Sequence, residues 1–467
     1  MRYISTRGEA PMLGFTEAML AGLARDGGLY TPATPPRSTP AEIRALAGLA
    51  YAEAATRLVQ PFIGDEMDSA ALAALTEDAY AGFRHAATAP LVQLDNNLFL
   101  VELFHGPTLA FKDFAMQWLG RLMNRALRER QTRATLLAAT SGDTGAAAIE
   151  AFGGQSQTDV FILFPLGRVS DVQRRQMTTV DKPNVHAVAL EGTFDDCQSI
   201  VKALFNDLAF RDAMKLSGVN SINWARILAQ IVYYFTSAVA LGAPDRRVSF
   251  AVPTGNFGDV LAGYYAKRMG LPINRLAIAT NENDILVRAL ANGVYKPLGV
   301  KATQSPSMDI QVSSNFERLL FEAYDRDAGA LRALMGGLKQ SGEFAIAPRP
   351  LAVIQRDFDA YRVDEDACTE EIGRAYRASG IVIDPHTAVG VNAARRALAR
   401  DPATPVVALA TAHPAKFPDA VERAIGQRPV LPGRLRDIEL REERFSILPN
   451  DAAAVAQFVR AHTRVAA

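Results

Sequence analysis

The sequence predicts an α/β protein with mainly parallel sheet, helices on both sheet faces and an α-rich segment in front. Most of six short apolar runs lead into a helical pattern within a few residues, and helical spacing fills most of the chain before residue 90. Strands that are apolar on both faces are typical of parallel sheets covered by helices on both sides. We expect a mainly helical N-terminal domain over residues 1–92. An α/β region over residues 93–467 should form large and small subdomains around a central cleft.

The elements follow in order along the chain. Residues 17–25 and 41–87 have helical spacing, and the Pro-rich run TPATPPRSTP between them predicts a surface connection. The predicted strands are 134–140, 160–164, 185–190, 248–252, 275–280 and 405–411. Ligands of such sheets bind beyond the carboxyl ends of the strands, and the polar motifs of this chain lie just after these strands.

Composition excludes several classes of protein. The 467 residues hold 50 basic and 50 acidic side chains, which argues against nucleic-acid or membrane-surface partners. Cys197 and Cys368 are far apart and lack metal-ligand spacing, so we expect no metal site, no disulfide framework and a reducing compartment. Apolar runs fall short of the roughly 20 residues that span a bilayer. Glu9 and Glu17 interrupt the apolar residues near the N-terminus, so this segment does not resemble a secretory signal. We therefore expect a cytoplasmic location.

Lys112 lies in the segment FHGPTLAFKDFAMQ, residues 104–117. Its neighbours Ala110, Phe111 and Phe114 are apolar, and such surroundings favour the neutral amine. A neutral lysine can form a Schiff base with an aldehyde cofactor. Taken alone, the residue could equally extend its charge into water from a helix end.

A glycine-bearing loop, TGNFG at 254–258, follows the strand predicted at 248–252. Gly255 and Gly258 allow close approach of the backbone, and free N–H groups at the start of the next helix bind anions. The loop has no Lys or Arg, so it is not a nucleotide P-loop. It suits a small phosphate held by amides and by Thr254 and Asn256. The alternative is an ordinary glycine turn.

Two more polar motifs follow predicted strands. TSGDTG begins at Thr140 and opens a helix, where Ser141, Asp143 and Thr144 are either ligand contacts or simply helix caps. Thr411 ends the strand at 405–411, and its hydroxyl would point into the same crevice. A hydroxyl is a weak partner for a pyridine nitrogen and would not keep it protonated. A strand-terminal Thr is also a common β-former.

Candidate anion-binding side chains occur in two further segments. Asn220, Asn223 and Arg226 have three-residue spacing in NSINWARILAQIVYYF, and GRVSDVQRRQM adds Arg168 and Ser170. Guanidinium and amide groups suit carboxylate or phosphate recognition. Both segments could instead be solvated helix starts. The segment DPHTAVG, with Asp384, His386 and Thr387, could close the cleft or cap a helix.

These motifs together resemble threonine synthase, a pyridoxal-phosphate enzyme of the tryptophan-synthase-like group (fold type II), in its longer bacterial and fungal type. The segments that carry the resemblance are DGGLYTP, FHGPTLAFKDFAMQ, ATSGDTGAAA, EGTFDDCQ, NSINWARILAQIVYYF, PTGNFGD, ATNEND, SPSMDIQVSSNFERLL, DPHTAVG and TAHPAKFP. They extend over almost the whole chain.

The resemblance implies a fold of two open, twisted, mainly parallel sheets flanked by helices, with pyridoxal 5'-phosphate as cofactor. It implies that Lys112 forms the internal aldimine and that Thr411 contacts the pyridine nitrogen. Asp143 and Thr144 would lie near the ring or the substrate. The cofactor phosphate would be held by Thr254, Gly255, Asn256, Phe257 and Gly258.

The implied reaction is a β,γ-replacement that converts O-phospho-L-homoserine and water into L-threonine and phosphate, the last step of threonine biosynthesis. Lys112 would act as base and acid at the α and β carbons. As a hypothesis, the substrate phosphate meets Arg168, Ser170, Asn223 and Arg226.

Several alternatives remain open at this point. A serine or threonine dehydratase would need no second phosphate site. A phospholyase would release 2-oxobutyrate without adding water at the β carbon. A non-catalytic phosphate-binding α/β protein would not need Lys112. The sequence leaves open whether the protein is a monomer or a homodimer.

Overall fold

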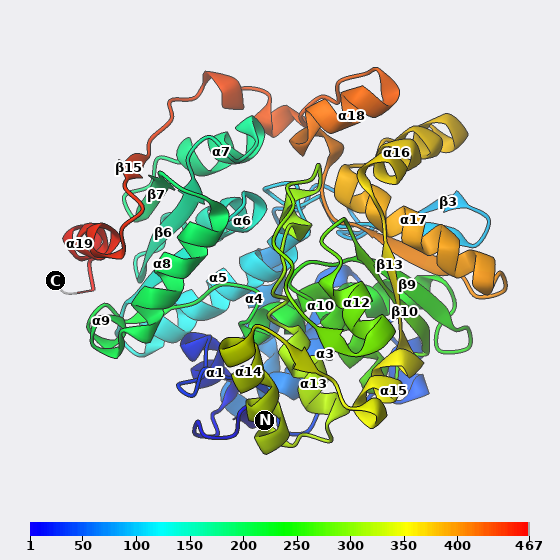
Figure 1. The fold of residues 1–467 in the computed structure, drawn as a ribbon, viewed down its shortest axis with the longest axis horizontal. Coiled ribbons are helices and arrows are strands. Elements are labelled where there is room, and N and C mark those ends of the chain that lie inside the picture. The colour runs from blue at the N-terminus through cyan, green and yellow to red at the C-terminus, as the bar shows by residue number, and fades with distance from the viewer. Residues whose placement is uncertain (466–467) are drawn as a thin grey trace.

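A computed structural model describes residues 1–465, which form two separate open sheets with helices around them (Figure 1). The larger sheet has the strand order β13-β10-β9-β14-β4-β3, and its pairs are parallel except for the β3–β4 hairpin. Its strands are β3 (Leu91–Asp95), β4 (Leu98–Glu102), β9 (Val248–Pro253), β10 (Ile273–Thr280), β13 (Phe358–Arg362) and β14 (Val406–Ala410).

The second sheet has the order β15-β7-β6-β5-β8 and is parallel throughout. Its strands are β5 (Ala134–Ala139), β6 (Thr158–Pro165), β7 (Val185–Leu190), β8 (Leu216–Ser217) and β15 (Ser446–Leu448). The predicted fold class is confirmed, and each of the six predicted runs coincides with a strand to within a few residues at its ends. The strands β3, β4, β8, β13 and β15 were not predicted.

The first 90 residues are mainly helical, with one small two-stranded antiparallel sheet. The predicted helix at 17–25 is shorter, because Gly22 leaves the helical conformation at φ 64°. The predicted 41–87 segment contains separate helices, and the Asp68 side chain caps the last of them by accepting from Ala71 N–H. The elements are β1 (Tyr3–Ser5), α1 (Phe15–Ala21), β2 (Tyr30–Pro32), α2 (Pro40–Arg44), α3 (Tyr51–Ile63), η1 (Gly64–Glu66) and α4 (Ser69–Tyr80).

The domain boundary stays a prediction, but a cut at residue 92 would divide β3 from its own hairpin. Leu91 of β3 pairs with Val101 of β4, so the first residues of β3 already belong to the larger sheet. We therefore propose that the boundary falls in the connection before Leu91.

Helices cover both faces of each sheet. In β5, Leu136 and Ala138 pack with α6, whereas Leu137 and Ala139 face α8 on the other side. In β9, Phe250 likewise faces α10 and α11, and Ala251 faces α17. This alternation within wholly apolar strands is what parallel sheet buried on both faces requires.

The remaining helices connect these layers, and α5 and α10 lie against each other in the middle of the molecule (Figure 1). They are α5 (Lys112–Glu129), α6 (Asp143–Phe152), α7 (Asp171–Thr178), α8 (Phe194–Asn206), α9 (Leu208–Ala213), α10 (Trp224–Ala240), α11 (Gly258–Arg268), α12 (Ile285–Asn292), α13 (Phe316–Ala323), α14 (Ala328–Ser341), α15 (Pro348–Asp357), α16 (Glu365–Ser379), α17 (Pro385–Arg400), α18 (Pro418–Ile425) and α19 (Ala452–His462). Short elements are β11 (Val294–Tyr295), β12 (Phe344–Ala345), η2 (Pro306–Met308), η3 (Pro414–Lys416), η4 (Gly433–Leu435) and η5 (Ile438–Leu440).

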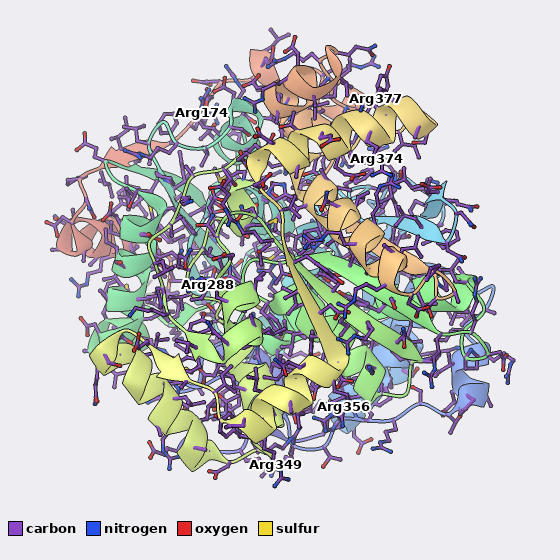
Figure 2. All side chains as sticks on the ribbon, turned by 45° about the vertical axis from the view of Figure 1, so that its right-hand side comes forward. Arg174, Arg288, Arg349, Arg356, Arg374 and Arg377 are labelled. Carbon is purple, nitrogen blue, oxygen red and sulfur yellow. The ribbon has the colours of Figure 1, made fainter. Side chains whose placement is uncertain are left out.

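A fully buried arginine ties the N-terminal segment to the rest of the chain. The guanidinium of Arg318 donates to the Tyr30 carbonyl oxygen at 2.7 and 3.0 Å and to the Ile222 carbonyl oxygen at 2.6 Å. Most arginines lie on the outside instead: Arg349 on α15 and Arg374 and Arg377 on α16 are exposed (Figure 2).

We predict that Arg318→Met destabilises the protein strongly. It leaves two buried carbonyl oxygens without a donor, at about 1 to 3 kcal/mol each in the free energy of unfolding. Arg349→Met is the matched control, because its ion pair with Asp325 is exposed and contributes about 0 to 1 kcal/mol. Calorimetric melting of both variants checks this, and equal melting temperatures would contradict it.

Candidate active site

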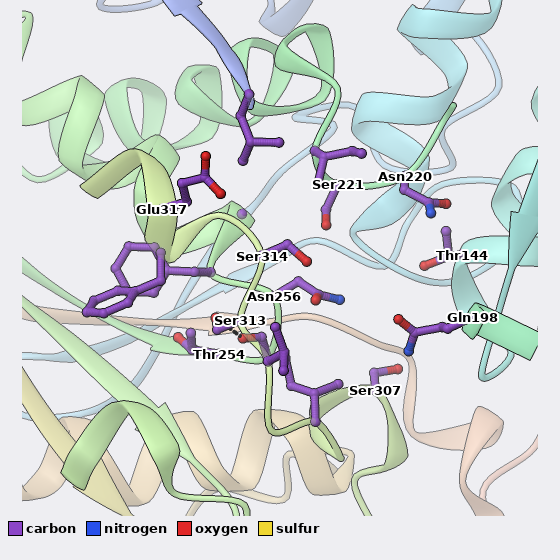
Figure 3. A pocket seen from close by; sticks show the side chains of 18 of the residues that line it. Thr144, Gln198, Asn220, Ser221, Thr254, Asn256, Ser307, Ser313, Ser314 and Glu317 are labelled. Carbon is purple, nitrogen blue, oxygen red and sulfur yellow. Dashed lines mark hydrogen bonds between the residues drawn. The ribbon is translucent and has the colours of Figure 1, made fainter. Parts of the chain in front are cut away.

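One cavity of about 510 Å³ lies where loops from both sheets meet. Its wall includes the segments that follow β4, β5, β9 and β14 at their carboxyl ends. Figure 3 shows Thr144, Asn256 and Ser307 around the same space, with Asn220 and Gln198 beside Thr144. The structure thus brings together side chains that lie far apart in the sequence.

Lys112 is the first residue of α5 and lines this cavity. Backbone hydrogen bonds fix the loop in front of it to the segment after β14: Phe111 N–H donates to the Thr411 carbonyl oxygen at 2.8 Å, and His413 N–H donates to that of Leu109 at 3.0 Å. Leu109 adopts φ 64°, an uncommon left-handed conformation for a branched residue. These contacts place the amine beside Thr411.

The Lys112 amine is nearly inaccessible to solvent from outside, with the residue 8% exposed. Its Nζ lies 3.3 Å from Asp143 Oδ2 and 3.5 Å from Ser307 Oγ. Burial lowers the pKa of Lys112 below its ordinary value; Asp143 opposes this shift and Lys416 reinforces it. A lysine in this state is suited to nucleophilic and acid–base chemistry.

Asp143, at the start of α6, is the partner of several groups. Its Oδ1 lies 2.8 Å from Lys416 Nζ and accepts from Gln173 Nε2 at 2.9 Å. Its Oδ2 also accepts from Ser307 Oγ at 3.3 Å. Burial alone would raise the pKa of Asp143, but Lys416 and Lys112 outweigh it and hold that pKa well below its ordinary range. Asp143 is therefore an ionised carboxylate inside the protein.

The loop at 254–258 forms a phosphate-sized cradle. Within the described chain, the N–H groups of Gly255, Asn256, Phe257 and Gly258 donate to no protein acceptor. Phe257 has φ 63°, which turns the loop, and its ring is buried against Phe316 with centroids 5.4 Å apart. Non-glycine residues in sparsely populated backbone regions, such as the left-handed one, are frequent at functional sites. The free amides at the start of α11 fit the phosphate of a bound cofactor.

Gly255 is required by close packing. A Cβ there would lie 2.8 Å from the carbonyl oxygen of Ser307, on the loop that faces the cradle. The chain can approach this closely only without a side chain at position 255.

The structure brings most predicted site residues to one cavity. Lys112, Asp143, Thr144, Thr254, Gly255, Asn256, Phe257, Gly258 and Thr411 all line it. The residues present therefore fit pyridoxal phosphate, with an amine, an amide cradle and a hydroxyl around one space. The role of each residue stays a prediction.

The substrate-binding set is only partly brought together. Arg226 lines the cavity and is 2% exposed, whereas Arg168 is exposed and lies outside the lining. Ser170 caps α7 by accepting from Gln173 N–H. Asn223 caps α10, and its Nδ2 donates to the carbonyl oxygens of Met19 and Gly218. Ser170 and Asn223 thus act as helix caps, a role that the sequence did not assign to them.

Sequence reasoning missed three groups at the site: Ser307, Gln173 and Lys416. His386 was considered only as a cap or a cleft residue, and it lines the cavity. Its Nε2 accepts from Ser307 N–H at 3.2 Å, so its Nδ1 carries the proton that Asp384 Oδ2 accepts at 2.7 Å. The clue was available, since SPSMD and TAHPAKF were among the resembling segments.

Sequence models of three protein domains match the chain. "Threonine synthase N terminus" matches residues 2–80, "Pyridoxal-phosphate dependent enzyme" matches 83–412, and "Threonine synthase, C-terminal" matches 387–459. The threonine synthase of Pseudomonas aeruginosa is 52% identical over 463 residues, which cover 99% of this chain and 98% of that protein. The chain belongs to the threonine synthase family.

Solved structures agree with this assignment. The pyridoxal-phosphate-bound threonine synthase of Brucella melitensis superposes with a TM-score of 0.95 at 59% identity, covering 99% of this chain and all of the other. Yeast threonine synthase gives a TM-score of 0.93 at 40% identity, covering 99% and 98%. The predicted family, fold type, pyridoxal-phosphate cofactor and enzyme class are confirmed.

Two further observations concern the described residues only. None of their helices is long and apolar enough to cross a membrane. Residues 1–465 also contain no group of three or more His, Cys, Asp or Glu side chains placed to hold a metal ion.

We predict that Gly255→Ala weakens cofactor binding. The added Cβ would push the cradle away from the Ser307 carbonyl oxygen at a cost of about 1 to 3 kcal/mol, since overpacking is destabilising. The dissociation constant for pyridoxal phosphate, measured by titration of the apoenzyme, should rise about tenfold. Gly336→Ala, a glycine with open space around it in α14, is the matched control and should bind normally. Unchanged binding in Gly255→Ala would contradict the role of the cradle.

Proposed function

We propose that the protein converts O-phospho-L-homoserine and water into L-threonine and phosphate, using pyridoxal phosphate held through Lys112. The observation that carries this proposal is the presence of two anion-binding features in one cavity. The amide cradle at 254–258 suits the cofactor phosphate, and the buried guanidinium of Arg226 is available for a second anion. A dehydratase acting on serine or threonine would have no substrate phosphate to place there.

The residues that would hold the cofactor are Lys112, the cradle 254–258 and Thr411. When bound, pyridoxal phosphate supplies a conjugated ring that accepts electron density from the substrate carbons. Thr411 offers a hydroxyl and no charge to the ring nitrogen, whereas Asp143 and Thr144 border the space beside Lys112.

Lys112 is our candidate for moving protons at the α and β carbons. Because its pKa is lowered, the amine gives up its proton more readily than an ordinary lysine, as a group that accepts and returns a proton in one turnover must. Asp143 and Ser307 both contact Nζ, so they aim the amine, and His386 in turn fixes the loop of Ser307 through its backbone N–H. Oriented groups of this kind reduce the reorganisation that the reaction requires.

Arg226 is our candidate for the substrate phosphate. Only its Nη1 has a partner, the Val219 carbonyl oxygen at 3.2 Å, and Nε has none within residues 1–465. Burial lowers the pKa of Arg226 to about 10, which still leaves it a cation at neutral pH. Charge-assisted hydrogen bonds to phosphate would satisfy the guanidinium.

We no longer propose substrate contacts for three residues of the predicted set. The side chain of Arg168 is exposed, and those of Ser170 and Asn223 cap helices. A cytoplasmic location, the absence of nucleic-acid and membrane partners, and a monomeric or homodimeric state stay predictions.

We predict that Lys112→Ala abolishes turnover. Removing an acid–base group lowers the rate about 10² to 10⁴-fold, and here it also removes the covalent anchor of the cofactor. Phosphate, threonine and 2-oxobutyrate released from O-phospho-L-homoserine would be measured together with the visible absorbance. The wild type should be yellow and give equal amounts of threonine and phosphate, whereas the variant should be colourless. Phosphate with 2-oxobutyrate from the wild type would instead indicate a phospholyase.

We predict that Arg226→Met raises the KM for O-phospho-L-homoserine about tenfold or more, because a hydrogen bond to a charged group contributes about 1.5 to 3 kcal/mol. It should also relieve inhibition by inorganic phosphate. Arg168→Met is the matched control, since that arginine is exposed and outside the cavity lining.

Arg226 could instead bind the phosphate of the cofactor. Measuring the dissociation constant for pyridoxal phosphate in both variants distinguishes this role from substrate binding. Weaker pyridoxal phosphate binding with an unchanged substrate KM would assign Arg226 to the cofactor phosphate and overturn its proposed role.

A further inference from the structure

A second buried lysine lies at the site and has no part in the reaction as proposed above. Lys416 ends η3, six residues after β14, and is 0% exposed. Its Nζ is 2.8 Å from Asp143 Oδ1 and donates to the Thr108 carbonyl oxygen at 2.8 Å. Lysines are almost never fully buried unless paired, and this one shares its carboxylate with Lys112.

The two lysines are not equivalent partners of Asp143. Lys416 Nζ is closer, at 2.8 Å from Oδ1, while Lys112 Nζ is 3.3 Å from Oδ2. If Lys112 were the only cation near this carboxylate, the pair would favour its ammonium form. An ammonium group cannot attack an aldehyde, because its nitrogen lone pair is occupied. The site therefore needs a second positive charge if Lys112 is to be neutral.

We propose that Lys416 is the permanent counter-ion of Asp143 and a positioning residue that lets Lys112 exist as a neutral amine in the open cavity. The ion pair Lys416–Asp143 keeps the carboxylate charge compensated when Lys112 loses its proton. Asp143 can then aim the neutral amine as an acceptor without holding it in the charged form. This inference deepens the proposed function, because it rests on Lys112 as the residue that captures the cofactor.

The other charged groups around Lys112 do not replace Lys416. Arg226 from α10 acts on Lys112 as a like charge and also lowers its pKa, but it makes no ion pair with Asp143 within the described chain. His386 from α17 accepts a hydrogen bond at Nε2 and donates from Nδ1 to Asp384, so its ring is satisfied in the neutral form.

Two other carboxyl groups near Lys112, those of Asp259 and Asp113, do not take the place of Asp143 as its partner. Asp259 from α11 is buried, and Tyr233 and Tyr234 donate to its Oδ1 at 2.6 and 2.9 Å. Burial raises the pKa of Asp259 to about 7, and the two hydroxyl donors only partly oppose this, so below that pH it is mostly uncharged. Asp113, beside Lys112 in α5, is held by Thr108 through N–H and Oγ1 at 2.8 and 2.7 Å. Asp143 is the carboxylate in direct contact with the amine.

A purely structural role for Lys416 is the competing explanation, because its bond to the Thr108 carbonyl oxygen also tethers the loop before Lys112. The two roles differ in one measurable property. A tether affects stability and loop position, whereas a counter-ion sets the pH at which Lys112 loses its proton.

The test measures the titration of Lys112 without cofactor or substrate. Full-length apoenzyme is labelled with formaldehyde and cyanoborohydride at a series of pH values, and methylation of the Lys112 peptide is quantified by mass spectrometry. Only the neutral amine reacts, so the midpoint of labelling against pH reports its pKa. Lys416→Met should raise this midpoint by about one pH unit or more, which slows labelling at pH 7 about tenfold.

Two control variants accompany this measurement. Lys416→Arg keeps the positive charge and should stay close to the wild-type midpoint. Lys267→Met removes a lysine with the same kinds of partner, the carboxylate of Asp357 at 2.9 Å and the Asn274 carbonyl oxygen at 3.1 Å, and should leave the Lys112 midpoint unchanged.

A second arm keeps the proposal falsifiable if Lys416→Met does not fold. Asp143→Asn removes the carboxylate charge and leaves Lys416 in place, so the Lys112 midpoint should fall below the wild-type value. Where the variants fold, adding Lys416→Met to Asp143→Asn should raise the midpoint by less than Lys416→Met raises it in the wild-type background. An unchanged midpoint in folded Lys416→Met, or a raised midpoint in Asp143→Asn, would overturn the proposal. Neither result depends on which reaction the loaded enzyme performs.

Discussion

The buried carboxylate of Asp143 is the interaction on which the arrangement of the site depends. Its oxygens contact four side chains from separate segments: Lys112 of α5, Gln173 of α7, Ser307 in η2 and Lys416 of η3. A buried carboxylate that loses its partners costs several kcal/mol, so these four segments are stable only when assembled together. The same contacts fix the direction of the Lys112 amine before any ligand arrives. Folding and preorganisation of the site are therefore one event.

Parallel pairing brings these segments within reach of each other. The strands β4 and β14 pair in register from Leu98–Val406 to Glu102–Ala410, and their contact continues past the strand ends as the bridge between Ala110 and Ala412. Lys112 and Thr411 are neighbours of this bridge. The cradle after β9 and the polar loop after β5 reach the same cavity because they also leave the carboxyl ends of parallel strands. Sheet direction thus determines which loops can share a ligand.

The sequence predicted those features in which local pattern and tertiary position coincide. Mainly apolar runs followed by polar loops predicted β5, β9 and β14, and Asp143, the cradle and Thr411 lie in or beside those loops. β13 and β15 were missed because FDAYR is half polar and SIL is only three residues long, so their pairing depends on partners distant in the chain. Ser307 and Lys416 were missed because short 3₁₀ turns have no periodic signal.

The conformation of Asn223 follows from where the helix begins. The three-residue spacing of Asn220, Asn223 and Arg226 was interpreted as one face of a helix or its entry. Asn223 is instead the N-cap of α10, with φ −66° and ψ 124°, and the residues before it are not helical. Its side chain therefore turns back to the backbone, and only Arg226, inside the helix, keeps the predicted direction into the cavity.

The charges of the cavity support our proposal that Arg226 binds a substrate anion, because the other cations of its lining that have no ion pair in the described chain, Lys202 and Lys339, are exposed to solvent. Lys416 and Asp143 compensate each other, and Lys112 is neutral when its proton has left. Arg7, which also lines the cavity, is already paired with Glu317 at 3.0 Å. Arg226 makes no ion pair within residues 1–465 and is buried. In the low-dielectric interior of a protein, an uncompensated cation attracts an anion more strongly than it does in water. A phosphorylated substrate would supply a negative charge, and its binding would offset the desolvation cost of the buried Arg226 guanidinium.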